Sequence, residues 1–404
     1  MNRIIAAVAV AALARATLAE EPQQPVQAQP ASLQQQQQDR GAEPFDSSAI
    51  QGKIDSLSQQ LGETKKDVSG LKKLKVSGYV QARETYNDSP TPIYTGTAPK
   101  DTGFTIRRGR FKAVYDAEWS QFALQLDATP NGVGLKEAFA RLKLPVSGLA
   151  IDAGLQLLPF GYDVGVRSSA DLDLLERADF AKTFLKGEYD LGVSLVGVRG
   201  PFNVKVGLFN GNGVDAKTGG YDNDQHKDVI GRLGFDGGFV TGGVSGWYGQ
   251  TINYKSTTAD RRYDRARVGA DMQVYLDLLP VGGTAVKGEY LWGKTQIGED
   301  NGGAGVALGK IGWGWDAIVT QNVGRWNQIA VRYQQFNPDV KIDRAANPTK
   351  VFVQDEIAGA VHTLVSPNMK LSLAYYHPMY REKGSQAASS PEKDSVMAQL
   401  QAKF

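Results

Sequence analysis

The sequence predicts a transmembrane antiparallel β-barrel of about sixteen strands, an all-β fold, preceded by a short N-terminal coiled-coil helix. Three observations support this. From Lys75 to Phe404, segments of about ten residues alternate apolar and polar side chains, as tilted strands that cross a bilayer do. The turns between these segments alternate in length, and residues 1–19 resemble a secretory signal peptide.

The amino terminus carries the three parts of a signal peptide. Arg3 supplies the positive charge, Ile4–Ala14 the apolar core, and Thr17–Ala19 the cleavage site, although a mitochondrial-type segment or a buried helix is the alternative. Cleavage after Ala19 would remove Arg3 and Arg15, which takes the formal net charge from +2 to zero. A neutral chain has no global attraction to nucleic acid, so we expect no nucleic-acid partner.

Residues 20–45 are rich in proline and glutamine and poor in apolar side chains, which predicts a flexible linker. In residues 46–74, apolar residues then recur at alternating spacings of four and three. A spacing of 3.5 residues keeps one stripe facing a partner helix, so we predict a periplasmic coiled coil between chains. The alternative is an amphipathic helix packed on its own domain. The stripe consists of Ile50, Ile54, Leu57, Leu61, Thr64, Val68 and Leu71.

Residues 75–404 are predicted to form the barrel. We count sixteen strands, with 239–250 and 352–365 the least regular, and fourteen or eighteen remain open. Short turns at one end and long loops at the other are typical of outer-membrane barrels, whereas a soluble sandwich or propeller would also alternate. The short turns include 145–148, 236–238 and 366–368, and the long loops 87–102, 211–226, 293–309 and 378–393.

Aromatic residues near the strand ends are predicted to form two girdles at the membrane interfaces. They are Trp247, Tyr248, Tyr290, Trp292, Trp313, Trp315, Trp326, Tyr333 and Tyr375. The chain ends in Phe404, with apolar residues at every second position back to Val396. This pattern resembles the terminal strand that the outer-membrane assembly machinery recognises, so we expect that machinery to be a partner.

The face opposite the apolar one is predicted to line the lumen. Its fourteen cations are Arg83, Arg108, Arg110, Lys112, Arg141, Lys143, Lys205, Arg232, Arg265, Arg267, Lys287, Arg332, Lys370 and Lys403. Its eight acids are Asp127, Glu137, Asp152, Asp190, Asp228, Asp271, Glu289 and Asp316. An excess of positive charge within a low-dielectric wall predicts a preference for anions. Alternatively, the charges pair across strands and fill a narrow or plugged lumen.

Residues 159–184 form the longest segment without alternation inside the barrel region. A loop of this length needs a function or a packing site. It follows the fifth strand and would be the third long loop, the natural candidate to fold inward and narrow a pore. Its cations Arg167, Arg177 and Lys182 could join the strand cations there. The alternative is an ordinary surface loop.

Composition excludes several other classes of protein. No run of 18 apolar residues exists and the mean hydropathy is −0.33, so a helical membrane protein is excluded. The absence of cysteine rules out disulfides, zinc-thiolate sites and a cysteine nucleophile, and three histidines offer little for a metal site. No histidine lies beside a serine elbow, and no phosphate-binding loop is present, so we expect neither an enzyme nor a cofactor.

Five blocks of the sequence, in order, resemble the phosphate-selective porin O and P family. They are Phe104–Phe111 (FTIRRGRF), Leu155–Gly161 (LQLLPFG), Ser168–Arg177 (SSADLDLLER), Leu208–Gly213 (LFNGNG) and Asp224–Arg232 (DQHKDVIGR). The resemblance implies a sixteen-stranded trimeric barrel with an inward third loop, in which an arginine and lysine ladder conducts anions. Arg107 and Arg108 occupy the matching arginine pair, but strand alternation places only Arg108 inward.

Two positions depart from this family. Leu157 stands where members often have lysine, and Tyr189 where an arginine often precedes Asp-x-Gly-Val. The strand pattern and this resemblance together predict an outer-membrane porin, in contact with lipid, that favours small anions such as phosphate, and the resemblance implies a homotrimer. A general or differently selective porin, or a structural anchor with a closed barrel, is the alternative. The predicted pore residues are Arg107, Arg108, Arg110, Lys112, Arg141, Lys143, Arg167, Arg177, Lys182 and Arg232.

Overall fold

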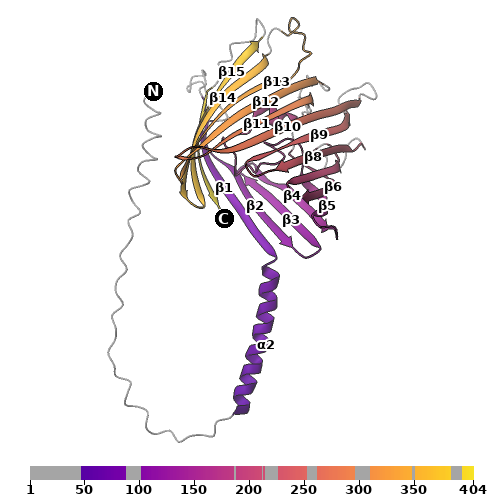
Figure 1. Cartoon of the computed structure of the whole chain (residues 1–404), viewed down its shortest axis with the longest axis vertical. Coiled ribbons are helices and arrows are strands. Elements are labelled where there is room, and N and C mark those ends of the chain that lie inside the picture. Colours follow the sequence, from indigo (N-terminus) through magenta and orange to yellow (C-terminus); the bar gives the residue numbers. More distant parts are fainter. Residues whose placement is uncertain are drawn as a thin grey trace, which may run out of the picture. The chain divides into compact units, whose positions relative to one another are not determined.

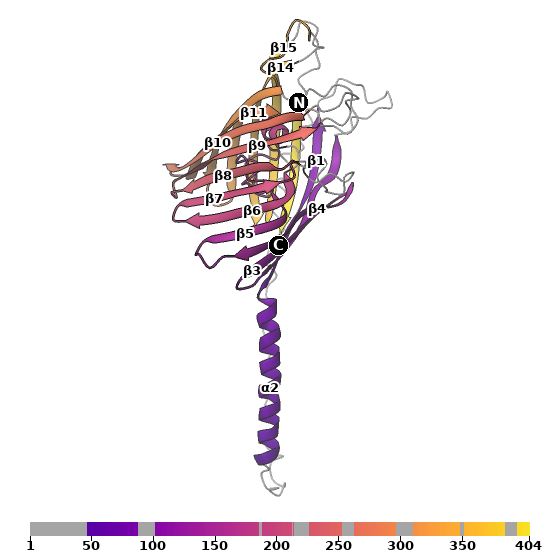
Figure 2. The ribbon, with the colours of Figure 1, turned by 90° about the vertical axis from the view of Figure 1, so that its right-hand side faces the viewer.

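The structure, a computed structural model, describes residues 47–87, 102–185, 188–211, 213, 226–252, 262–295, 310–347, 351–383 and 394–404. In these residues, sixteen antiparallel strands close into one barrel, each strand pairing with its neighbours in the chain and β1 with β16 (Figure 1). The predicted fold class and strand number are confirmed. Figure 2 shows β5 to β11 following one another along the wall.

The strands vary from eight to eighteen residues in length. Their bounds are β1 Leu74–Asn87, β2 Gly103–Asp116, β3 Ser120–Thr129, β4 Gly132–Lys143, β5 Leu149–Leu157, β6 Tyr189–Arg199, β7 Phe202–Phe209, β8 Asp228–Asp236, β9 Val240–Ile252, β10 Arg262–Leu279, β11 Gly282–Thr295, β12 Lys310–Val323, β13 Asn327–Asn337, β14 Val351–Ser366, β15 Met369–Lys383 and β16 Ser395–Lys403. The two least regular strands of the sequence are thus present as β9 and β14.

Alternation along the strands separates two environments, as β3 illustrates. Phe122 and Leu124 are 53% and 42% exposed on the outer wall, whereas Gln125 faces the lumen and is 8% exposed. Closure pairs β1 with β16 and leaves no strand edge, which allows backbone polar groups to be satisfied within a bilayer.

The turns follow the predicted positions at one end of the barrel. The predicted short turns fall between β4 and β5, β8 and β9, and β14 and β15. At the other end, β15 continues past Pro378 to Lys383, so the prediction that the long loop starts at Pro378 is wrong. Pro378 lies opposite Glu356 of β14 and beyond Tyr376, the last residue of β15 that pairs with β16.

Among the residues that the structure describes, two helices accompany the strands: α2 (Ser47–Leu71), before β1, and the short α3 (Asp179–Phe184). The chain divides into two compact units, Met1–Lys66 and Asp67–Phe404, each described by itself. Ile54 and Leu61, on the predicted stripe of α2, are 49% and 55% exposed in the single chain. The predicted signal peptide and linker lie outside the described residues. No described helix is long and apolar enough to cross a membrane.

The main apolar core lies inside the barrel. Phe160, Phe180 and Phe184, from the segment between β5 and β6, pack against Trp247 of β9 and other inward residues of the wall. The predicted place of Trp247 in an interfacial girdle is therefore wrong. Trp247 shares the inward parity of β9 and is 4% exposed, with its indole N–H donating to Asp228 at 2.7 Å.

Candidate functional site

The segment between β5 and β6 crosses the lumen. Inward side chains from strands far apart in the barrel hold it, among them Ser245 of β9, which accepts the backbone N–H of Gly161 at 3.1 Å. Tyr79 of β1 hydrogen-bonds Ser169 at 2.7 Å, and Gln401 of β16 donates to the carbonyl of Ala170 at 3.1 Å. His362 of β14 donates to the carbonyl of Asp173 at 2.7 Å. Because these strands surround the lumen, only a loop inside the barrel can reach all of them. The predicted inward third loop is present.

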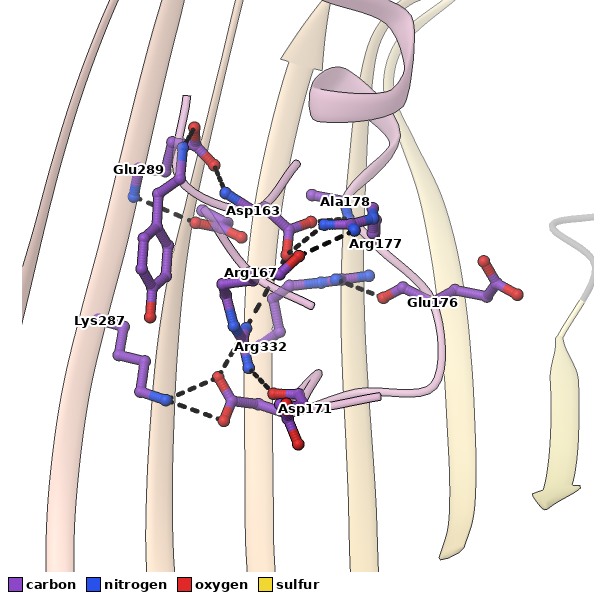
Figure 3. Close-up of polar contacts among 12 residues, drawn as sticks. Asp163, Arg167, Asp171, Glu176, Arg177, Ala178, Lys287, Glu289 and Arg332 are labelled. Atoms are coloured by element: carbon purple, nitrogen blue, oxygen red, sulfur yellow. Dashed lines mark hydrogen bonds and ion pairs between the residues drawn. The ribbon is translucent and has the colours of Figure 1, made fainter. Parts of the chain in front are cut away.

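A carboxylate of β11 anchors the start of this loop. Glu289 of β11 accepts the backbone N–H groups of Tyr162 and Asp163, at 2.6 and 3.0 Å. Further along, Arg332 of β13 donates to the carbonyl of Glu176 at 2.9 Å, and both anchors are visible in Figure 3. The loop's backbone groups thus find partners despite their burial.

Cations and acids of the loop also pair with each other and with the wall. Arg167 contacts the Asp173 carboxylate at 2.9 Å, and Lys287 of β11 contacts the same carboxylate at 2.9 Å (Figure 3). Asp163 accepts the backbone N–H of Ala178 at 3.1 Å and lies 4.0 Å from Arg177. These contacts hold Arg167 and Arg177 in fixed positions within the loop.

Both arginines of the pair in β2 point into the lumen because the strand contains a β-bulge. Gln81 of β1 pairs with Arg108, while the next residue of β1 pairs with Ile106, so Arg107 is an extra residue. Beyond the bulge the parity of β2 is reversed, which leaves Phe104 on the outer wall, 87% exposed. The prediction that only Arg108 faces inward is therefore wrong.

Arg107 and Arg83 hold the loop through Glu176. Arg107 Nε donates to the Glu176 carboxylate at 2.8 Å, and Arg83 also pairs with it. Burial alone would raise the pKa of Glu176, but hydrogen bonds and charge attraction from the two arginines hold this pKa well below its usual range. We call these three residues the Glu176 latch. Arg108 lies beside it, donates to Gln81 Oε1 at 3.2 Å and forms no ion pair with any described residue.

A cavity of about 340 Å³ lies between the loop and the wall formed by β1 to β4, β6 and β16. Its lining includes five cations and a single acid, Glu137. The cations are Arg110, Lys112, Arg167, Arg177 and Lys403.

Each of these cations has a carboxylate partner, but most of the partners lie outside the cavity lining. Among them, only Glu137 also lines the cavity. The pairs are Arg110–Asp127, Lys112–Glu137, Arg167–Asp173, Arg177–Glu188 and Lys403–Asp171. The cationic ends therefore line the cavity while most of the neutralising acids do not. Such an arrangement can attract an anion and replace part of its hydration shell.

The structure brings four of the ten predicted pore residues together at this cavity: Arg110, Lys112, Arg167 and Arg177. Arg107 belongs to the Glu176 latch, and Arg108 lies beside it. The other four do not line the cavity, and each pairs with an acid elsewhere. Their pairs are Arg141–Asp152, Lys143–Asp116, Lys182–Asp179 and Arg232–Asp271.

Two tyrosines were missing from the predicted site. Tyr79 and Tyr189 line the cavity, each 8% exposed, and Arg110 donates to the Tyr189 hydroxyl at 3.3 Å. Tyr79 could have been found from the sequence, because it lies four positions from Arg83 on the same strand and therefore faces the lumen with it. Tyr189 was noticed only as a departure from the family pattern. Among the described residues, no cluster of histidine and acidic side chains could hold a metal ion.

The sequence matches no protein-family model and no curated protein. Among solved structures, it is similar to an anion-selective porin from Comamonas acidovorans, with 14% identity and a TM-score of 0.54 over 82% of this chain and 99% of the other. It is also similar to the outer membrane channel DcaP of Acinetobacter baumannii (12%, TM-score 0.56) and to Salmonella typhi OmpF (11%, 0.58), each over 82% of this chain and 97% of the other. At this identity the likeness shows the fold: this chain has the barrel fold of outer-membrane porins.

Proposed function

We propose that this protein is a passive diffusion channel of the outer membrane that favours small anions such as phosphate, as in the phosphate-selective porin O and P family. The observation that carries the proposal is the cavity beside the inward loop, lined by five cations and by Glu137 as its one acid. The porin fold supports the channel, and a structural neighbour described as anion-selective agrees with the preference.

The preference follows from simple electrostatics. A unit charge about 4 Å from an ion contributes ~1 kcal/mol in a water-like dielectric, which is roughly a fivefold change in partition, and more where the wall excludes water. Removing one charge from the cavity should therefore change ion selectivity measurably. Because Lys112 and Glu137 pair with each other across this cavity, they offer changes of opposite sign at one place.

Reversal potentials in a potassium chloride gradient across a planar bilayer test the proposal. We expect the purified protein to be anion-selective. Lys112→Gln should lower the chloride-to-potassium permeability ratio up to about fivefold, and Glu137→Gln should raise it by a similar factor. Arg325→Gln, in the turn between β12 and β13 and outside the cavity lining, is the matched control and should change nothing. Cation selectivity of the unaltered protein would overturn the anion site but not the channel.

The extent of loop anchoring favours a second candidate, a structural anchor with a closed barrel. The loop is pinned to at least five strands, from β1 to β16. The same bilayer recordings separate the candidates, because a closed barrel gives no conductance for the unaltered protein or any variant.

We further propose a homotrimer assembled through the barrel wall and the coil of residues 46–74, with residues 1–19 as a signal peptide, 20–45 as a linker and 75–404 as the barrel. The exposed apolar stripe of α2 supports a partner helix. Phe404, at the seam where β16 meets β1, exchanges backbone hydrogen bonds with Gly78 at 3.0 and 3.1 Å. A signal at this seam suits recognition by the assembly machinery before the barrel closes.

A further inference from the structure

A groove of about 690 Å³ lies on the outer wall of the barrel, across the short-turn ends of β5 to β8. Its central row is defined by strand pairing: Leu149 faces Gly197, Gly197 faces Val204, and Val204 faces Leu233. Leu233 is outward because its neighbour Arg232 pairs with Asp271 in the lumen. The groove is thus separate from the cavity of the proposed channel.

Gly197 forms the buried floor of the groove, between the side chains of Leu149 and Val204. No side chain fits at this position without displacing them, because a Cβ would lie 2.9 Å from Leu149 Cδ2 and 3.0 Å from Val204 Cγ1. Most of the lining side chains are apolar, with Ser147, Asn203 and Arg199 as the polar ones, and Phe202 packs on Phe235 at a ring distance of 5.5 Å. In a bilayer, such a slot fits an acyl chain by shape and by burial of apolar surface.

A cation stands at the rim of this slot. Arg199 lines the groove two residues beyond Gly197 on β6, roughly 7 Å further toward the turn. It is exposed and pairs with no acid among the described residues. A guanidinium at the end of a strand lies where lipid headgroups begin, and it binds phosphate through two parallel hydrogen bonds.

We propose that this groove binds one phospholipid of the periplasmic leaflet, with an acyl chain over Gly197 and the headgroup phosphate on Arg199. The site rests on the proposed position of the barrel in the outer membrane. The positive rim favours a phospholipid over a second copy of the chain, since a lipid supplies both the chain and the anion that the groove lacks.

The test is native mass spectrometry of the full-length protein in detergent with added phosphatidylglycerol or with diacylglycerol of the same chains. We expect one retained phosphatidylglycerol per barrel and weak retention of diacylglycerol. Arg199→Gln should weaken phosphatidylglycerol binding about tenfold, the usual value of a charged hydrogen bond, and should leave diacylglycerol unchanged. Gly197→Leu should abolish binding of both, because it fills the slot.

Matched controls are Arg325→Gln, a cation at another short turn, and Gly246→Leu, an outward glycine of β9 with open space around it. Both should bind lipid normally. Equal retention by all variants would overturn the site, and a change of oligomeric mass in Gly197→Leu without a change in lipid would assign the groove to a second copy instead. Single-channel conductance should stay the same in every variant, so loss of the lipid site is distinguishable from failure of the channel.

Discussion

At the scale of single residues, one extra amino acid in β2 determines how the loop is held. Without the bulge at Arg107, strict alternation would turn Phe104 and Ile106 into the lumen and Arg107 toward lipid. With the bulge, Phe104 and Ile106 stay on the outer wall, and Arg107 reaches Glu176. The bulge is therefore a positioning device of the kind often found near functional sites. Glu176 has two arginine partners, so its charge is the natural place to test the latch.

We expect Glu176→Gln to loosen the loop. The change keeps the size of the side chain but leaves Arg83, 3% exposed, without its counter-charge. Removing one partner of a buried pair costs about 3–5 kcal/mol. The measurements are the midpoint of unfolding in denaturant and single-channel current, where we expect a lower midpoint and larger or noisier openings.

Asp179→Asn is the matched control, because Asp179 pairs with Lys182 at an exposed position where an ion pair contributes about 0–1 kcal/mol. The latch idea fails if the two variants behave alike.

The depressed pKa of Glu176 also sets a pH dependence. Its contribution is present above the unfolded value of about 4.3 and is lost only as pH falls through the lower folded value. Glu176→Gln should therefore lower the denaturant midpoint by the same amount at about pH 7 and at about pH 5.

At the scale of elements, the strands were predictable and the anchors of the loop were not. The alternation of apolar and polar residues within a strand indicates which of its side chains face the lumen. Strands such as β3 or β16 can therefore be located without reference to distant residues. The loop was recognisable because alternation stops at Pro159. Its partners Glu289 and Arg332, more than a hundred residues away, could be placed in the lumen by parity but not assigned to the loop, because contact depends on closure and register. Bulges such as that at Arg107 leave no local signal.

The contact between helix α3 and strand β12 allows a test of how tightly the loop packs on the wall. Gly314 of β12 lies under Phe180, and a Cβ at Gly314 would come within 2.2 Å of Phe180 Cβ. We expect Gly314→Ala to displace α3 and to destabilise the docked loop by about 1–3 kcal/mol, the usual cost of overpacking. Denaturant midpoints and conductance check this. Gly246→Ala, on the outer wall with nothing within 4 Å, should leave both unchanged; an equal loss there would mean that alanine acts on strand stability and not on the loop.

At the scale of the whole molecule, the barrel and α2 make different demands on assembly. The outer wall of the barrel exposes many apolar side chains and is suited to lipid as well as to a partner. The apolar stripe of α2 supports the proposed partner helix, since Leu57 and Leu61 are 64% and 55% exposed in a helix whose neighbouring faces are polar. Three heptads are marginal alone, so the coil should add to an association that the barrel begins.

If the barrel begins the association and the coil adds to it, Leu61→Asp in the full-length protein should weaken the assembly without abolishing it. Loss of a buried leucine removes about 1.5–3 kcal/mol per chain, and three carboxylates at one level of a coil repel each other. We expect the proposed trimer to persist at room temperature but to dissociate at a lower temperature than the unaltered protein, as measured by mass-resolved sedimentation after heating. Gln59→Asp, on the side of α2 away from the stripe, adds the same charge and should not change the dissociation temperature. If Leu61→Asp also has no effect, the stripe does not join helices of neighbouring chains, and the trimer would depend on the barrel wall alone.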